Sequence, residues 1–350
     1  MFLSKLFSKK IEEPEPEPEP PTPVPERKKI LSDFIKNPLV LKYVTRVLNL
    51  GVNGVVTEFY ENSRNLDDDV PMKGFRKHIT MNRGFVPCQD AYRVYLKFPG
   101  LPSDYYHANY IGTIPQPHRF ICAQTPLRHT QHHFWAMVVQ EEVASIVMFD
   151  DVRDCNCDGK RYWPTEEEGV KIFGPHRHEI KVRCTQKVGG DRTVLLNWGS
   201  DKFRLVTIHQ YPAKIDYNDG NYDRKLFNKA RDVLIKNKTP ILVHCSTGVG
   251  LSGMFILMSY MYEQLLAGVD CSHGVHILSV LRQQRYGLIL EDNQYLCAHA
   301  AVMQHFMLER HSRAEYQVFD FYKDWDDQYS KIVAQREIKK AKPIEYIIHR

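Results

Sequence analysis

The stretch HCSTGVGLSG, from His244 to Gly253, decides the fold. It follows the apolar run TPILV, which is typical of a buried strand, and it leads into the apolar-faced stretch from Ser252 to Ala267, which is typical of a helix. Cys245 would therefore stand where a strand passes through a short glycine-containing loop into the N-terminus of a helix. Backbone N–H groups and the positive end of the helix dipole make such a junction an anion site.

The loop predicts a ring of backbone N–H groups around the sulfur of Cys245, formed by Ser246, Thr247, Gly248, Val249, Gly250 and Leu251. We expect Gly248 and Gly250 to adopt backbone conformations that other residues resist. A cysteine in such a ring has a lowered pKa and becomes a nucleophile towards phosphorus. Outside this context, a cysteine at the end of a buried strand would be a small core hydrophobe.

The loop resembles the HCxxGxxR[ST]G loop of the tyrosine-specific protein phosphatases, and companion segments follow in that family's order. These segments are Asn82-Arg83, VPC at Val86 to Cys88, DYYHANYI at Asp104 to Ile111, CAQTPL at Cys122 to Leu127, FWAMV at Phe134 to Val138, ASIVMF at Ala144 to Phe149, YWP at Tyr162 to Pro164, Gln210-Tyr211, RQQR at Arg282 to Arg285 and Gln294-Tyr295. The resemblance covers roughly Phe34 to Arg310. It implies the family's α/β fold, a twisted mixed β-sheet flanked by helices.

Leu251 is the main departure from that family. The resemblance implies an arginine at this position, whose planar fork grips two phosphoryl oxygens and the transition state. Losing two charge-assisted hydrogen bonds costs about 3 to 6 kcal/mol, or roughly 10² to 10⁴ in rate. Leucine can neither donate a hydrogen bond nor compensate charge, so this change argues against efficient turnover.

The general acid of the resembled family is the aspartate of a mobile Trp-Pro-Asp loop. Aligning on Gln210-Tyr211 gives Lys214-Ile215-Asp216, so the carboxylate is kept but the tryptophan and proline are not. Asp216 is therefore the candidate acid, with a solvated loop residue as the alternative interpretation and Asp219 as a weaker substitute.

Two further positions of the implied pocket are altered. The tyrosine that follows Asn-Arg in the family is replaced by Gly84 or Phe85, and Phe85 could restore stacking if the loop shifts. Leu290 replaces the glutamine that positions the hydrolytic water, so breakdown of a phosphocysteine would be slow. The resemblance keeps Ser252 and Gln294 with Cys245 and Asp216 as catalytic candidates and keeps His244 as a supporting residue. Arg282 and Arg285 are expected to buttress the fold outside the phosphate grip.

Three functional hypotheses follow. The first is a catalytically impaired phosphatase domain, a pseudophosphatase that binds phosphotyrosine-containing or other protein ligands. The alternative is an active or weakly active protein-tyrosine phosphatase that uses a Cys245 phosphocysteine intermediate. In the third, the pocket is vestigial and interactions run through the Pro/Glu linker or the C-terminal tail.

Bulk composition narrows the class of protein. The net charge of +5 arises from 47 basic and 42 acidic residues that are interspersed, which is not a nucleic-acid signature. Eight scattered cysteines favour a reducing compartment, and the C-x-C at Cys155 and Cys157 is a poor metal site. No cofactor is implied. No apolar stretch approaches the ~18 residues that span a bilayer, and the opening segment is too short for a signal peptide. We therefore expect a cytoplasmic protein without stable membrane insertion; its oligomeric state is not indicated.

The chain divides into three parts. Residues 1–28 are expected to be a disordered basic and Pro/Glu-rich segment, because EEPEPEPEPPTPVPE from Glu12 to Glu26 cannot pack. Residues 29–312 form the phosphatase-like domain, and residues 313–350 form a tail of unknown role. Periodicity predicts two or three helices between Lys29 and Asn65, and further helices at Thr130 to Glu141 and Asn293 to Leu308. Strands are predicted at YRVYL, RFICA, ASIVMF, HEIKV and TVLLNW, between Tyr92 and Trp198, in addition to TPILVHC.

Overall fold

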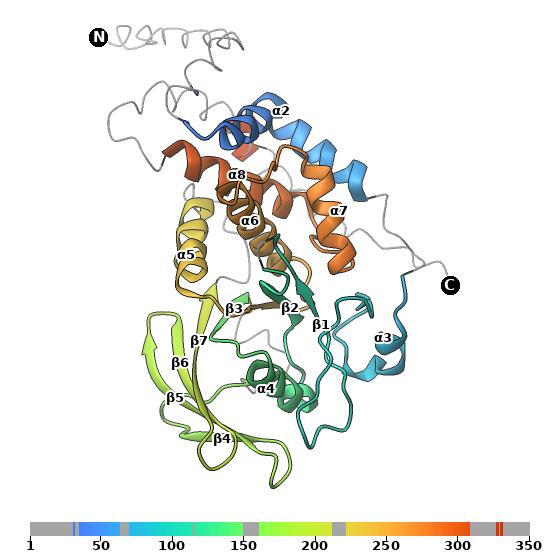
Figure 1. Cartoon of the computed structure of the whole chain (residues 1–350), viewed down its shortest axis with the longest axis vertical. Coiled ribbons are helices and arrows are strands. Elements are labelled where there is room, and N and C mark those ends of the chain that lie inside the picture. The colour runs from blue at the N-terminus through green and yellow to red at the C-terminus, as the bar shows by residue number, and fades with distance from the viewer. Residues whose placement is uncertain are drawn as a thin grey trace, which may run out of the picture.

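The apolar strand that ends at Cys245 lies in the middle of an eight-stranded mixed sheet with the order β1-β2-β8-β3-β7-β6-β5-β4 (Figure 1). The computed structural model describes residues 35–63, 70–114, 116–149, 161–211 and 222–308, together with residues 31, 327, 328, 330 and 331. The strands are β1 (Ala108–Ile111), β2 (Phe120–Gln124), β3 (Ser145–Phe149), β4 (Val170–Phe173), β5 (Ile180–Val188), β6 (Asp191–Asn197), β7 (Phe203–Tyr211) and β8 (Ile241–Cys245).

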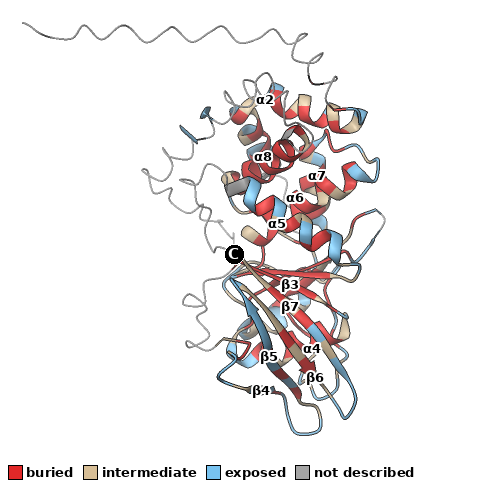
Figure 2. Ribbon diagram, turned by 90° about the vertical axis from the view of Figure 1, so that its left-hand side faces the viewer, coloured by how far each residue is buried: buried red, intermediate tan, exposed pale blue. Residues whose placement is uncertain are grey.

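The sheet has a parallel centre and antiparallel edges. Strand β8 runs parallel to β2 and β3, and β3 runs parallel to β7. Every residue of β2, β3 and β8 is buried, as expected for strands covered on both faces. The outer strands β4 and β5 alternate between buried and exposed positions over part of their length, which is the period-2 pattern of a sheet with one solvated face (Figure 2).

Helices cover the two faces of the parallel centre unequally. The helices are α2 (Pro38–Ser63), α3 (Lys73–Lys77), α4 (Gln131–Gln140), α5 (Tyr222–Lys236), α6 (Leu251–Leu266), α7 (Gly274–Gln284) and α8 (Asp292–Leu308), with 3-10 turns η1 (Ile79–Met81) and η2 (Arg128–Thr130). Successive residues of β8 enter different cores: Ile241, Val243 and Cys245 face the core that includes α6 and α8, whereas Leu242 faces the core that includes α4. The strand is thus fixed from both sides, and its last residue is held with it.

Helix α2 corrects one expectation from the sequence. Pro38–Glu61 is long and apolar enough to cross a membrane by length and composition, with a mean hydropathy of 1.2. Its apolar residues Tyr43, Val44 and Val47 are fully buried in the same core as α6 and α8. The helix bends at Gly51, whose φ is 62°, so two helical segments meet at a kink in the region where two or three helices are expected.

Most secondary-structure predictions are confirmed. Helices α4 and α8 begin and end within one residue of the predicted bounds, and the runs at RFICA, ASIVMF, HEIKV, TVLLNW and TPILVHC all contain strands. The strand predicted at YRVYL is wrong. Tyr92 has a φ of 60°, and Arg93 forms only an isolated bridge with Asn109. The sequence patterns did not predict strands β1, β4 and β7 or helices α3, α5 and α7.

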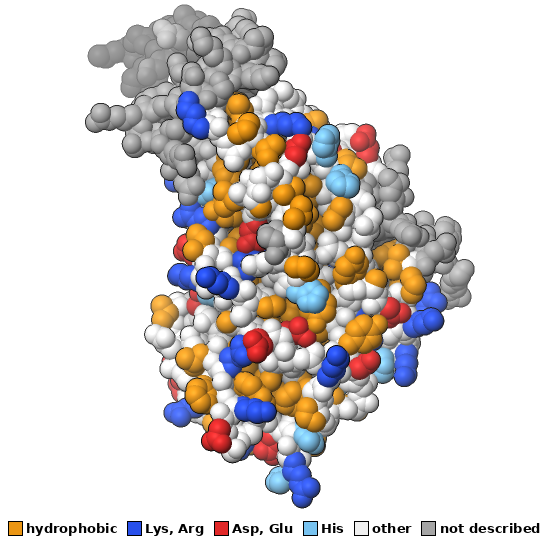
Figure 3. Space-filling model, viewed as in Figure 1, with side chains coloured by type: hydrophobic (Ala, Val, Ile, Leu, Met, Phe, Trp, Pro, Cys, Tyr) orange, Lys and Arg blue, Asp and Glu red, His pale blue; other side chains and the backbone are white. Residues whose placement is uncertain are grey.

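The remaining expectations concern charge and the chain ends. Basic and acidic side chains are interspersed over the visible face in Figure 3, in keeping with the small net charge. The predicted segment 1–28, most of the tail 313–350 and the Cys155–Cys157 pair lie outside the described residues.

Candidate active site

Cys245 lies at the junction that the sequence predicts. It ends β8, the loop 246–250 follows, and Leu251 is the first residue of the 16-residue helix α6. Cys245 is buried, with 6% of the residue exposed. The N-terminus of a long helix, with its unpaired N–H groups and positive dipole end, therefore adjoins Cys245.

Gly248 is the position in the loop that requires glycine. Its φ is +75°, and an added Cβ would collide with the backbone of Ala123, with the Gln124 nitrogen only 2.7 Å away. Gly250, by contrast, has a φ of −75° and a ψ of −98°. Of the two glycines, Gly248 has the left-handed conformation that other residues resist, whereas the φ of Gly250 is negative.

Arg285 fixes the loop after β8 by binding two of its backbone carbonyls. Its fully buried guanidinium donates from Nε to the Gly248 carbonyl at 3.2 Å and from Nη2 to the Thr247 carbonyl at 3.2 Å. Asn109 Oδ1 accepts from Nη1 at 2.7 Å, and His107 Nδ1 lies 3.0 Å from Nη2. Because a trans peptide directs its N–H opposite its carbonyl, the next two N–H groups point away from Arg285.

Arg282 is also a structural arginine. Its Nε donates to the Leu288 carbonyl at 3.0 Å, and its Nη2 donates to the Ile289 carbonyl at 3.1 Å. With Arg285 engaged on loop carbonyls, both arginines of the RQQR segment serve backbone groups. The expectation that they buttress the fold is confirmed.

Leu251 occupies the first position of α6. Its half-buried side chain packs against the apolar core that contains α6 and α8. We call the loop 246–250 together with the N-terminus of α6 the cradle. Leu251, which adjoins this loop, thus carries a hydrocarbon side chain.

His244 connects the loop to two of the companion segments. Its Nδ1 lies 2.9 Å from Thr125 Oγ1, and its Nε2 lies 2.8 Å from the Tyr162 hydroxyl. Burial, with a smaller contribution from the Arg83 charge, lowers the pKa of His244 to about 3. His244 is therefore neutral near pH 7 and acts as a hydrogen-bonding support for Cys245.

The loop from Asn82 to Phe85 lies beside this cradle. Gln124 donates from Nε2 to the Met81 carbonyl at 2.7 Å and accepts the Arg83 backbone N–H at 2.8 Å. Gly84 has a φ of +68°, and the Phe85 side chain is 79% exposed. Phe85 thus does not pack as a wall of the pocket in this conformation.

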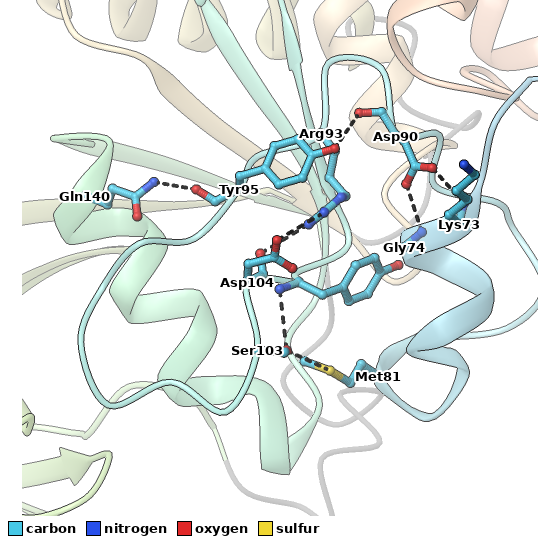
Figure 4. Close-up of polar contacts among 10 residues, drawn as sticks. Lys73, Gly74, Met81, Asp90, Arg93, Tyr95, Ser103, Asp104 and Gln140 are labelled. Atoms are coloured by element: carbon cyan, nitrogen blue, oxygen red, sulfur yellow. Dashed lines mark hydrogen bonds and ion pairs between the residues drawn. The ribbon is translucent and has the colours of Figure 1, made fainter.

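Asp90 and Arg93 belong to a polar network that includes the start of α3 and Asp104 (Figure 4). Asp90 accepts the backbone N–H groups of Lys73 at 2.7 Å and Gly74 at 2.9 Å, which fixes the start of α3. The Arg93 guanidinium lies 3.8 Å from the Tyr95 ring centroid and pairs with Asp104 at 3.6 Å.

Tyr105 completes the link between this network and the loop. The Tyr105 ring centroid lies 5.3 Å from the Arg93 guanidinium. The Tyr105 hydroxyl donates a hydrogen bond to Asn82 Oδ1 at 2.5 Å. The DYYHANYI segment therefore fixes the loop that carries Arg83.

Gln294 and Ser252 also lie at the base of the loop. Gln294 Oε1 accepts the N–H groups of Leu290 at 3.1 Å and Glu291 at 3.4 Å, and its Nε2 would lie 3.2 Å from a Cβ on Gly250. Ser252 is fully buried, and its Oγ has no hydrogen-bond partner among the described residues. Leu290 is half-buried beside them.

The segment containing Asp216 lies outside the described residues, as do Lys214, Ile215 and Asp219. Its point of departure is nevertheless fixed. Tyr211 ends β7 opposite Phe149 of β3, and Phe149 is also opposite Cys245. The chain therefore leaves β7 at the same edge of the sheet as Cys245, two strands away.

The structure brings together several residues for which the sequence reasoning gave no role. Their side chains contact His244, the loop at Asn82 or Ser246; the residues are Thr125, Tyr162, Tyr105, Gln124 and Arg83. All five lie in or beside companion segments quoted above. Their presence was therefore visible in the sequence, although their pairing depends on contacts between distant segments.

Comparison with known proteins identifies the family. The family model described as protein-tyrosine phosphatase matches residues 78–304. The chain is 31% identical over 218 residues to "Tyrosine-protein phosphatase Lar-like" of Caenorhabditis elegans, covering 59% of this chain and 9% of that protein. It is 30% identical over 224 residues to human "Tyrosine-protein phosphatase non-receptor type 12", covering 60% of this chain and 28% of that protein. The chain thus spans less than a third of the length of these relatives.

Solved structures agree on the fold. A structure of PTPN18 in complex with HER2 phosphopeptides superposes with a TM-score of 0.65 at 22% identity, covering 77% of this chain and 99% of that one. The eight-stranded mixed sheet, the loop after β8 and the matched family model all lead to one conclusion: this chain belongs to the protein-tyrosine phosphatase family.

Proposed function

We propose that this chain is a pseudophosphatase, which binds phosphotyrosine-containing protein segments at the Cys245 loop and hydrolyses them poorly. The observation that carries the proposal is Leu251 at the first position of α6, beside an otherwise intact cradle. The loop N–H groups and the α6 N-terminus favour an anion. The side chain that would grip it most strongly in an efficient enzyme is missing.

The anion cradle is the part of the site that supports binding. We assign the phosphate to the backbone of Ser246, Thr247, Gly248, Val249, Gly250 and Leu251. Arg285 supports this assignment because it occupies the Thr247 and Gly248 carbonyls, which leaves the following N–H groups directed elsewhere. The PTPN18 structure contains phosphopeptides, and this likeness in fold makes a phosphotyrosine peptide the first ligand to test.

Poor turnover follows from what each step would require. Cys245 would attack phosphorus, Asp216 would protonate the departing tyrosyl oxygen, and Ser252 and Gln294 would assist release of the phosphocysteine. Leu251 removes transition-state stabilisation of about 3 to 6 kcal/mol. In the described geometry Gln294 Oε1 is engaged by the Leu290 and Glu291 N–H groups, and Leu290 itself cannot orient water.

The second candidate is a weakly active protein-tyrosine phosphatase. The observation that favours it is the retained Cys245 at the end of β8, followed by a short loop and the N-terminus of α6. In either case we assign the function to residues 29–312 and place the protein in cytoplasmic signalling. The scattered cysteines favour a reducing compartment, which supports that placement.

The deciding experiment compares the wild type with Leu251→Arg and Cys245→Ser. Binding to a phosphotyrosine peptide and to its unphosphorylated counterpart is measured by calorimetry, and phosphate release is measured separately. We expect the wild type to prefer the phosphopeptide and to release phosphate slowly. Leu251→Arg should increase phosphate release by roughly tenfold or more.

Two outcomes would contradict the proposal. A wild-type turnover of roughly 1 s⁻¹ or faster, abolished by Cys245→Ser, would identify an active phosphatase. If Leu251→Arg changed neither binding nor hydrolysis and the wild type did not distinguish the two peptides, the pocket would be vestigial.

A further inference from the structure

Arg83 places a guanidinium beside the first residue of the loop that follows Cys245. Its Nη1 donates to Ser246 Oγ at 3.4 Å, and Ser246 directly follows Cys245. The side chain is half-buried, so it is in contact both with the loop and with solvent. It reaches the cradle from the Asn82–Phe85 loop, whereas Leu251 lies at the start of α6.

The backbone of Arg83 is held in register with Cys245. Gln124, which is fully buried, pairs with Cys245 across the β2–β8 ladder. The same side chain binds the Met81 carbonyl and the Arg83 N–H, at 2.7 and 2.8 Å. On its other side the loop is fixed by Asn82, which accepts from the Tyr105 hydroxyl. The position of the guanidinium is therefore set by the sheet itself rather than by a free surface loop.

Among the described residues, Arg282, Arg285 and His244 near the loop make other contacts. Arg285 donates to two loop carbonyls from behind, and Arg282 binds the carbonyls of Leu288 and Ile289. His244 is buried and neutral near pH 7, and the Arg83 charge is one cause of its lowered pKa.

We propose that Arg83 pairs with the dianionic phosphate of a bound phosphotyrosine, and so supplies from the loop at Asn82 a charge that Leu251 cannot supply from α6. This inference rests on the proposed function. A guanidinium presents several N–H donors in one plane and suits two phosphoryl oxygens at once. Because Arg83 approaches from the Ser246 side of the cradle, it would bind the ligand without occupying the position from which an arginine at 251 acts. Phosphate binding would then depend on Arg83, whereas efficient hydrolysis would still require an arginine at position 251.

The test measures phosphotyrosine-peptide affinity by calorimetry for the wild type, Arg83→Gln, Arg83→Lys and Arg177→Gln. Arg177 is an exposed arginine in the turn between β4 and β5, so its variant controls for loss of one positive charge. We expect Arg83→Gln to weaken binding roughly tenfold or more, Arg83→Lys to weaken it less, and Arg177→Gln to leave it unchanged. Thermal midpoints of all four proteins show whether they are folded.

A double variant gives an independent readout. If an arginine at position 251 supplies the charge that Arg83 otherwise provides, Arg83→Gln should reduce affinity less in the Leu251→Arg protein than in the wild type. If Arg83→Gln binds the phosphopeptide as tightly as the wild type does, this inference is overturned and the proposed function remains intact. Failure of the folded wild type to bind the phosphopeptide would overturn both.

Discussion

Gly248 shows how a single residue fixes the geometry of the site. It combines a φ of +75° with a backbone contact that leaves no room for a side chain, because Ala123 and Gln124 of β2 lie against it. Gly189 in the turn between β5 and β6 has a similar φ of +58° but open space where its Cβ would be. The two glycines therefore separate the cost of backbone strain from the cost of a collision.

We predict that Gly248→Ala destabilises the protein more than Gly189→Ala does. Both substitutions place a non-glycine residue at positive φ, at a cost of about 1 to 3 kcal/mol. Gly248→Ala adds overpacking against β2 of about 1 to 3 kcal/mol. Urea unfolding of the wild type and the two variants measures the loss of unfolding free energy in each variant. Equal free energies of unfolding for the two variants would show that β2 yields to the added methyl group.

At the scale of elements, the loop after β8 depends on α7 through Arg285. This residue directly follows α7, and its guanidinium contacts Thr247, Gly248, Asn109 and His107. Burial, and secondly the Arg285 charge, lower the pKa of His107 to about 3, so this histidine is an uncharged acceptor.

Arg285→Met is expected to destabilise the fold by at least about 3 kcal/mol, because it leaves several buried acceptors without a donor. It should also weaken phosphopeptide binding by releasing the Thr247 and Gly248 carbonyls. Arg177→Gln serves as the surface control, and urea unfolding with calorimetry gives the two readouts. An Arg285→Met protein as stable as the wild type would mean that the acceptors find other donors.

The same contacts explain what the sequence could and could not predict. The strand, loop and helix around Cys245 were predictable because they are contiguous and their apolar periodicity changes at the loop. The strand expected at YRVYL does not form because positive φ at Tyr92 and the inward Arg93 interrupt the ladder, which apolar alternation does not reveal. The contact between Arg83 and Ser246 joins residues 163 positions apart, so only the folded sheet brings them together.

For the whole molecule, buried neutral histidines link stability to pH. Burial lowers the pKa of His107, His244 and His299 from 6.5 to about 3. These groups remain neutral in the folded protein, whereas in the unfolded chain they gain protons as the pH falls through 6.5. The unfolded state therefore binds more protons between pH 6.5 and 3, and acid favours unfolding.

We predict that the free energy of unfolding is nearly independent of these histidines above pH 7 and falls steadily from pH 6.5 towards pH 4. Each group contributes a slope of at most about 1.4 kcal/mol per pH unit. His299 offers a test away from Cys245: it lies in α8, and its Nδ1 is 3.0 Å from the Tyr43 hydroxyl. His299→Gln keeps a polar partner for Tyr43 and removes one titrating group, so the slope between pH 6 and 4 should decrease by up to that amount. The exposed His176→Gln is the matched control and should keep the wild-type slope. Identical slopes for His299→Gln and the wild type would mean that His299 is protonated in the folded protein, and the assignment of a neutral histidine core would fail.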